Sequence, residues 1–149
     1  MRAVVQRVAS AFVEVDGRRT GAIREGVVLF LGVRKGDGEA QLRHLAEKVL
    51  DLRIFPDAKH HMNRSIRDAG GEILLVSQFT LYGDCRKGRR PSFDEAEAPV
   101  RANEVYRDFA RYLAGCGFPP QEGIFGAAMT VHVENDGPVT ILLDSEGGF

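Results

Sequence analysis

The first third of the chain carries a hydrophobic pattern that predicts β-structure. β-branched and aromatic residues recur at close intervals, at Val4, Val5, Val8, Phe12, Val13 and Val15. Asp16-Gly17 is a dipeptide typical of a hairpin turn, and residues 18–24 form a second arm. The apolar run 27–33 follows without polar alternation, so we expect a strand that is buried on both faces.

Two later segments have the spacing of amphipathic helices. After a break at residues 36–38, one apolar face is formed by Leu42, Leu45, Ala46, Val49 and Leu50. The second helix is predicted from the stripe Ala102, Val105, Tyr106, Phe109, Ala110 and Leu113. Glycine and proline end this second helix after residue 114.

The remaining segments complete a β-rich plan. Residues 73–81 predict a second apolar strand that turns polar midway, and residues 83–99 predict a loop. Near the end, residues 129–133 alternate as a strand, residues 135–138 predict a hairpin turn, and residues 139–143 a last strand. We therefore expect one α+β domain over residues 1–149: a mostly antiparallel, barrel-like sheet with two main helices.

Composition restricts the cellular setting and the kind of partner. The chain has 149 residues, 44% hydrophobic and 28% charged, and its net charge of −1 means that a polyanion needs a local basic patch. No apolar run approaches the roughly 20 residues that span a bilayer, and the N-terminus lacks a signal-peptide pattern. We expect a reduced, cytoplasmic protein with no membrane partner.

Metal and thiol chemistry have little support in the spacing. The histidines His44, His60, His61 and His132 form no HExxH or His-x-His pattern, and no CxxC occurs, so we expect no metal and no cofactor. Cys85 is followed by cations, which lower a thiol pKa, and a small cysteine hydrolase is therefore an alternative. Otherwise Cys85 is a loop residue without a role, and Cys116 is a packing residue.

A basic run suits contacts with phosphate. Four of its five residues are cations, Arg86, Lys87, Arg89 and Arg90, and they surround Gly88. Arginine forks match phosphate oxygens, and glycine lets the backbone approach closely. The alternative is a solvated loop that is balanced by the acidic residues that follow it.

Two short segments contain polar groups in unusual places. Ser77, Gln78 and Thr80 interrupt an apolar strand, at a sheet end where backbone amides come free to bind a ligand. No base adjoins the hydroxyls, so an activated nucleophile is not demonstrated, and a strand with a polar outer face is the alternative. Gly137-Pro138 is a bond that can be cis at low cost, although the dipeptide alone is a weak signal.

Together these residues resemble the D-aminoacyl-tRNA deacylase (D-Tyr-tRNA(Tyr) deacylase) family. The resemblance runs nearly end to end, through Val5-Gln6-Arg7-Val8, Leu31-Gly32-Val33, Arg53-Ile54-Phe55 and Met62-Asn63. Its specific parts are Ser77-Gln78-Phe79-Thr80-Leu81, Arg90-Pro91-Ser92-Phe93 and Asn135-Asp136-Gly137-Pro138-Val139-Thr140. The His60-His61 pair and the tail after residue 144 depart from the family in variable places.

The resemblance implies an activity and an assembly. The substrate would be a D-amino acid esterified to the 3′ end of tRNA, with glycine mischarged on alanine tRNA as a further substrate. The protein would be a homodimer with active sites at the interface and no DNA partner. Gly137-Pro138 would be cis, would reach into the partner's pocket and would reject L-residues there.

The resemblance also implies roles for particular residues. The catalytic group comprises Ser77, Gln78, Phe79 and Thr80, with Thr80 either a nucleophile or a positioning residue. Backbone amides near Phe79 and Thr80 are candidates for oxyanion contacts, and the substrate's ribose 2′-OH could help to activate water. Contacts to tRNA or substrate are expected from Arg7, Arg86, Lys87, Arg89, Arg90, Met129, Asn135 and Thr140. A non-catalytic tRNA-end or nucleotide-binding module is the alternative, and it would bind tRNA without turnover.

Overall fold

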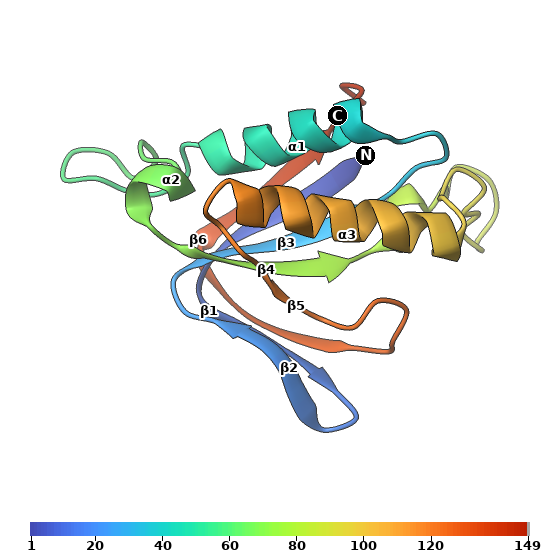
Figure 1. The fold of residues 1–149 in the computed structure, drawn as a ribbon, viewed down its shortest axis with the longest axis horizontal. Coiled ribbons are helices and arrows are strands. Elements are labelled where there is room, and N and C mark those ends of the chain that lie inside the picture. The colour runs from blue at the N-terminus through green and yellow to red at the C-terminus, as the bar shows by residue number, and fades with distance from the viewer. Residues whose placement is uncertain (149) are drawn as a thin grey trace.

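The computed structural model describes residues 1–148 (Figure 1). Its elements in chain order are β1 (Arg2–Val15), β2 (Arg18–Ile23), β3 (Gly26–Gly32), α1 (Glu39–Asp51), α2 (Ile66–Ala69), β4 (Glu72–Ser77), the 3₁₀ helix η1 (Phe79–Tyr82), α3 (Pro99–Gly115), β5 (Gln121–Glu122) and β6 (Thr130–Asp144). No helix within residues 1–148 is long and apolar enough to cross a membrane.

A single curved sheet organises the fold. The strand order is β2-β1-β3-β4-β5, and β6 pairs with the free side of β1. β1 is antiparallel to β2, β3 and β6, whereas β4 is parallel to β3 and β5. The sheet curls until its ends approach, since a Cβ at Gly21 of β2 would lie 2.5 Å from the Glu122 carbonyl oxygen of β5. The predicted α+β fold, barrel-like and carrying two main helices, is confirmed.

β3 separates two hydrophobic cores. On one face Val27, Leu29 and Leu31 pack under α1 and α3, which lie side by side in Figure 1. On the other face Val28 packs with Leu74 and the residues inside the curl. Only Phe30 within β3 is not fully buried, so the prediction of a strand buried on both faces is confirmed.

The predicted hairpin turn at residues 135–138 is wrong. β6 runs without interruption along β1, with Asn135 opposite Val8 and Thr140 opposite Gln6. Residues 136–139 therefore oppose Arg7 alone and form a bulge, which we call the β6 bulge. The local turn signal is overridden because pairing on both sides of the bulge keeps the chain on the same partner strand.

Three smaller elements also differ from the sequence-based expectation. The strand predicted over residues 73–81 ends at Ser77, and its last part is the 3₁₀ helix η1. α2 was not predicted because it has only four residues, although its Ser65 cap accepts a hydrogen bond from the Asp68 N–H. The two-residue β5 is too short to leave any hydrophobic pattern.

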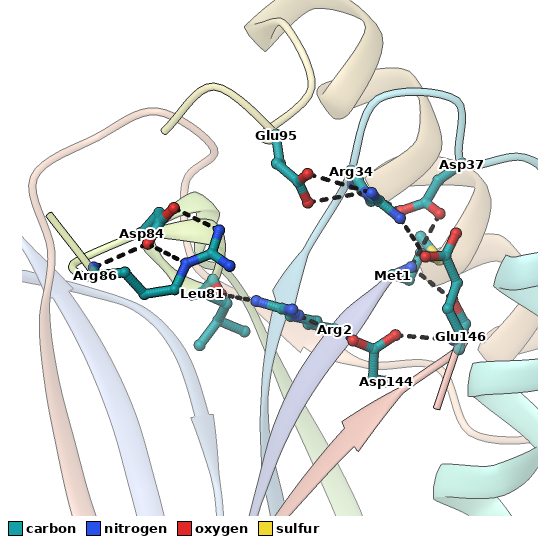
Figure 2. A network of polar contacts seen from close by, with 11 residues as sticks. Met1, Arg2, Arg34, Asp37, Leu81, Asp84, Arg86, Glu95, Asp144 and Glu146 are labelled. Atoms are coloured by element: carbon teal, nitrogen blue, oxygen red, sulfur yellow. Dashed lines mark hydrogen bonds and ion pairs between the residues drawn. The ribbon is translucent and has the colours of Figure 1, made fainter. Parts of the chain in front are cut away.

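A buried ion pair holds both ends of the described chain. The Met1 ammonium donates to Asp37 Oδ1 at 2.9 Å and to Ser145 Oγ at 2.6 Å (Figure 2). Asp37 Oδ2 accepts the Arg34 N–H at 2.7 Å, and Met1 itself is fully buried. The carboxylate of Asp37 therefore joins the first strand, the turn before α1 and the segment after β6.

We expect Asp37→Ala to lower the free energy of unfolding by about 3–5 kcal/mol, because it leaves the buried ammonium and the Arg34 N–H without an acceptor. Urea denaturation of the untagged chain measures the change. The matched control is Asp108→Ala, which removes an exposed carboxylate of α3 and should change stability by less than about 0.5 kcal/mol. Equal losses of stability in the two variants would contradict the structural role of Asp37.

Candidate active site

A cavity of about 610 Å³ opens where β4 ends. It is bounded by β4, η1, the start of α3 and the segment that leads into β6. Its polar lining comes from Ser77, Gln78 and Glu97, and Met129 and Val131 close one side. Four aromatic rings form much of the remaining wall, namely Phe79, Phe93, Tyr106 and Phe125.

The backbone at this strand end offers hydrogen-bond donors. Gln78 still donates its N–H to the Leu31 carbonyl at 2.8 Å, which completes the pairing of β4 with β3. The first hydrogen bond of η1 runs from Leu81 N–H to the Gln78 carbonyl at 3.3 Å. The N–H groups of Phe79 and Thr80 precede that bond, as the first donors of any helix do, and they are free to bind a ligand.

Thr80 directly follows the cavity-lining Phe79 but is not itself one of the residues that line the cavity. Gln78 Nε2 donates to Thr80 Oγ1, and Thr80 is exposed. Within residues 1–148 no histidine, carboxylate or lysine bonds to this hydroxyl. A hydroxyl needs an adjacent base to become a nucleophile, so the contacts favour a positioning role for Thr80.

Aromatic packing fixes the walls of the cavity. The rings of Phe79 and Phe93 meet edge to face, with centroids 5.0 Å apart. On the far side Tyr106 donates its hydroxyl to the Leu75 carbonyl at 3.1 Å, and burial raises the pKa of that hydroxyl. α3 thereby fixes the strand that leads into the motif at Ser77.

The basic run forms a small hairpin, residues 84–92, beside the cavity. Asp84 and Ser92 exchange two backbone hydrogen bonds, of 2.7 and 3.0 Å, and Phe93 follows directly. Arg86 donates to both carboxylate oxygens of Asp84, which lowers the pKa of Asp84 to about 2. Within the described chain the remaining three cations of this basic hairpin make no ion pair and are exposed: Lys87, Arg89 and Arg90.

Cys85 does not line the main cavity. It is exposed and borders a second cavity of about 570 Å³ with Arg2, Tyr82 and Glu95. Arg2 and Glu95 belong to the polar network of Figure 2. No histidine lines that second cavity among residues 1–148. The same part of the chain holds no cluster of histidine, cysteine and carboxylate side chains that could bind a metal ion. The lining therefore gives the cysteine-hydrolase alternative no histidine base.

The β6 bulge is held by the side chain of Asn135. Its Nδ2 donates to the carbonyls of Arg7 at 2.9 Å and Val139 at 3.0 Å, and its Oδ1 accepts the Thr140 hydroxyl at 3.3 Å. The Gly137–Pro138 peptide bond is cis, and both residues are exposed. Asn135 and Thr140 therefore shape the bulge from inside the sheet.

Arg7 is buried beneath the β6 bulge. Its Nη1 donates to the carbonyls of Ile54 at 2.6 Å and His61 at 3.3 Å. Its Nε lies 2.9 Å from Asp136 Oδ2 as an ion pair, without the alignment of a hydrogen bond. Only 8% of Arg7 is exposed, so within one chain it supports the bulge and does not project into the cavity.

The two specific motifs of the sequence do not meet within the described chain. Ser77, Gln78 and Phe79 line the cavity, whereas Gly137 and Pro138 do not. Val131 of β6 also lines the cavity, and the six residue steps from there to Gly137 span roughly 20 Å along a strand. The structure thus divides the predicted site into a cavity and a distant bulge.

Several cavity residues were not identified from the sequence, among them Tyr106, Glu97 and Phe125. Tyr106 belongs to the buried stripe of α3, so the sequence indicates only a core residue. The structure shows that it also lines the cavity. Glu97 was interpreted only as a charge that balances the basic run, and Phe125 follows a two-residue strand that no pattern predicts. No spacing rule in the sequence indicates that these residues converge.

We expect Gly137→Ala to destabilise the protein by about 1–3 kcal/mol more than Gly17→Ala. Both glycines have a positive φ, +113° and +74°, so both variants carry backbone strain. At Gly137 the added Cβ would also lie 2.8 Å from Val139 Cγ2 and 3.1 Å from Arg7 Nη2, while at Gly17 it meets nothing within 4 Å. Urea denaturation of the two variants measures the difference, and equal stabilities would contradict the close packing of the bulge.

Comparison with known proteins gives matches over nearly the whole chain. The model of the family described as D-Tyr-tRNA(Tyr) deacylase matches residues 4–144. A relative from Syntrophobacter fumaroxidans named D-aminoacyl-tRNA deacylase is 54% identical over 149 residues, which is 100% of both chains. Another of that name from Aquifex aeolicus is 54% identical over 145 residues, covering 97% of this chain and 98% of the relative.

Two solved structures share the fold of this chain. One named c-Myc DNA Unwinding Element Binding Protein has a TM-score of 0.92 and 41% identity, covering 97% of this chain and 98% of that chain. A second, described as "Structural Analysis of a probable eukaryotic D-amino acid tRNA deacylase", has a TM-score of 0.81 at 18% identity, covering 95% and 97%, and shows a shared fold alone. Since both the family model and full-length relatives at 54% identity match, the chain belongs to the D-Tyr-tRNA(Tyr) deacylase family.

Proposed function

We propose that this chain hydrolyses the ester between a D-amino acid and the 3′ end of tRNA, with free tRNA and the D-amino acid as products. The observation that carries the proposal is the cavity at the end of β4, where Ser77, Gln78 and Phe79 lie beside a basic hairpin. Membership of the deacylase family supports the same reaction. Such an arrangement suits a substrate with one small reacting group and an adjoining row of phosphates.

The reaction needs few groups from the protein because an aminoacyl ester is already activated. A water oxygen attacks the ester carbonyl carbon, the N–H groups of Phe79 and Thr80 donate to the developing oxyanion, and the ester C–O bond then breaks. The proton from water passes to the departing 3′ oxygen, with the ribose 2′-OH as relay. Thr80, fixed by Gln78, positions the ester and makes no covalent bond to it.

We extend the proposal to a homodimer in which the β6 bulge of one subunit enters the cavity of the other. Bulge and cavity lie roughly 20 Å apart along β6, which supports a site completed by a second copy. The face of the sheet away from α1 and α3 also carries an apolar stripe, where Val4 pairs across strands with Phe30 and Leu142. Leu142 is 53% exposed in the single chain, and a partner would cover it.

In this assembly the bulge sets stereospecificity. The backbone carbonyls of Gly137 and Pro138 accept hydrogen bonds from the α-ammonium of the substrate, and the space on the L side of the α-carbon is closed. Exclusion of this kind rejects every L-residue and accepts many D-residues, because it reads no side chain. Glycine has no side chain to exclude, so glycine mischarged on alanine tRNA is also cleaved.

Single-turnover deacylation of matched tRNAs tests the proposal. We expect D-Tyr-tRNA to be cleaved about 100-fold or more faster than L-Tyr-tRNA, because the L side chain must displace packed backbone. Thr80→Ala should retain cleavage within about tenfold, whereas loss of a true nucleophile costs on the order of 10⁴-fold or more. Glycyl-tRNA serves as the achiral control and should be cleaved.

Other outcomes of that measurement separate the alternatives. A wild type that binds tRNA without cleaving either ester would be a tRNA-end binding module and not an enzyme. Complete loss of cleavage in Thr80→Ala would return the hydroxyl to a covalent role. Full resistance of glycyl-tRNA would remove exclusion as the source of stereospecificity.

The basic hairpin makes a second prediction, for binding. We expect Arg89→Ala combined with Arg90→Ala to weaken tRNA binding and to reduce the slope of log K against log salt by about 0.9 for each duplex phosphate that the variant no longer binds. The control is Arg107→Ala with Arg111→Ala, which removes two exposed arginines of α3. Filter binding from low to high salt measures both slopes, and an unchanged slope would mean that the hairpin is only solvated. A DNA copy of the acceptor stem tests the expectation that DNA is not a partner.

A further inference from the structure

The loop between α1 and α2, residues 52–65, presents cations that the proposed mechanism does not use. It projects from the end of the molecule beyond α2 in Figure 1. Lys59, His60 and His61 are exposed on it, and Met62 is 47% exposed. Within residues 1–148 the Lys59 ammonium makes no hydrogen bond or ion pair. This α1–α2 loop is therefore a positively charged projection with unused donors.

The acidic residue of the α1–α2 loop is turned inward. Asp57 Oδ1 accepts the backbone N–H groups of Lys59 and His60, each at 2.7 Å, and Oδ2 accepts from Asn63 Nδ2. These bonds, the one from the Lys59 N–H first, lower the pKa of Asp57. The carboxylate thus works as a turn cap, and the same bonds direct the chain of Lys59 and His60 toward solvent.

The α1–α2 loop shares its anchor with the β6 bulge. Arg7 binds the loop through the carbonyls of Ile54 and His61, and its Nε faces the carboxylate of Asp136 in the bulge. One buried guanidinium therefore contacts both segments, and the α1–α2 loop and the β6 bulge meet at Arg7.

We infer that the α1–α2 loop is a second tRNA-binding element, in which Lys59 and His60 contact phosphates near the acceptor end. The inference rests on the proposed function. The basic hairpin lies at the opposite end of the molecule from the loop (Figure 1). If the bulge of one subunit enters the cavity of its partner, the α1–α2 loop of the first subunit is carried to the same site. It then lies on the side of that site opposite the partner's basic hairpin. Each site is then flanked by cations from both subunits, as a polyphosphate strand requires.

The double variant Lys59→Ala/His60→Ala tests the inference. The variant keeps the backbone N–H groups of both residues that cap the turn on Asp57, and it loses only the 3.7 Å contact between His60 Nδ1 and Asp57 Oδ1. The matched control is His44→Ala/Lys48→Ala, which removes one exposed histidine and one exposed lysine from α1. Two probes are used: deacylated tRNA titrated at several salt concentrations, and 3′-D-tyrosyl-adenosine, an ester without phosphates.

We expect the loop variant to bind tRNA about three- to tenfold more weakly than wild type at low salt, with a salt slope smaller by about 0.7–0.9. Its single-turnover rate on 3′-D-tyrosyl-adenosine should equal that of wild type, and the control variant should match wild type on both probes. Unchanged tRNA binding in the loop variant, or equal weakening in both variants, overturns the inference. If wild type still hydrolyses D-Tyr-tRNA in that case, the proposed function stands; a wild type that neither binds nor cleaves it overturns both.

Discussion

β1 is the strand on which every other part of the molecule depends. Its hydrogen-bonding edges serve three antiparallel partners, with β3 and then β2 on one side and β6 along the whole of the other. A strand used in this way fixes the register of its neighbours, because a slip of one residue would move each side chain to the opposite face. The helix-covered core and the core inside the curl both follow from this register.

The larger of the two irregularities in the ladder between β1 and β6, opposite Arg7, coincides with the proposed stereospecific element. At the β6 bulge, Arg7 has no single residue of β6 paired with it. Its side chain instead donates hydrogen bonds to the carbonyls of Ile54 and His61 in the α1–α2 loop. A buried cation is costly unless its donors are satisfied, so the bulge and the α1–α2 loop are constrained together. Asn135 supplies the matching constraint from within β6. The result is an exposed backbone segment that is held from behind, which suits a rigid surface for recognising a substrate.

The cavity arises from the end of a strand and not from a bulge in the ladder. It forms where a buried strand ends and the chain turns into η1, so backbone donors come free next to the motif at Ser77. α3 and its neighbouring aromatic rings then close the walls, while the basic hairpin stands at the rim. Cavity and bulge are each formed within one chain, and the proposed dimer only needs to bring two preformed halves together.

Periodic patterns in the sequence determined much of the fold. The apolar stripes of α1 and α3 and the unbroken run in β3 were correctly predicted, because burial on one or both faces leaves a period that a single segment shows. The polar break at Ser77 marks a strand end directly, and Ser77 lines the cavity that opens there.

The rest was decided by contacts between segments far apart in the chain. The turn predicted at residues 135–138 became a bulge because pairing with β1 on both sides outweighed a local preference. The partners of Arg7 within the chain lie 47 and 54 residues away, and no local pattern reveals them. Its role as a substrate contact stays a prediction. Tyr106, with the helical spacing of a core residue, became a wall of the cavity only when α3 packed against β4. The sequence by itself thus determined which segments are helices and strands and where polar chemistry interrupts them, since those follow from local periodicity. The tertiary structure decided how the halves of the site are shaped and separated, because that depends on long-range hydrogen bonds and packing.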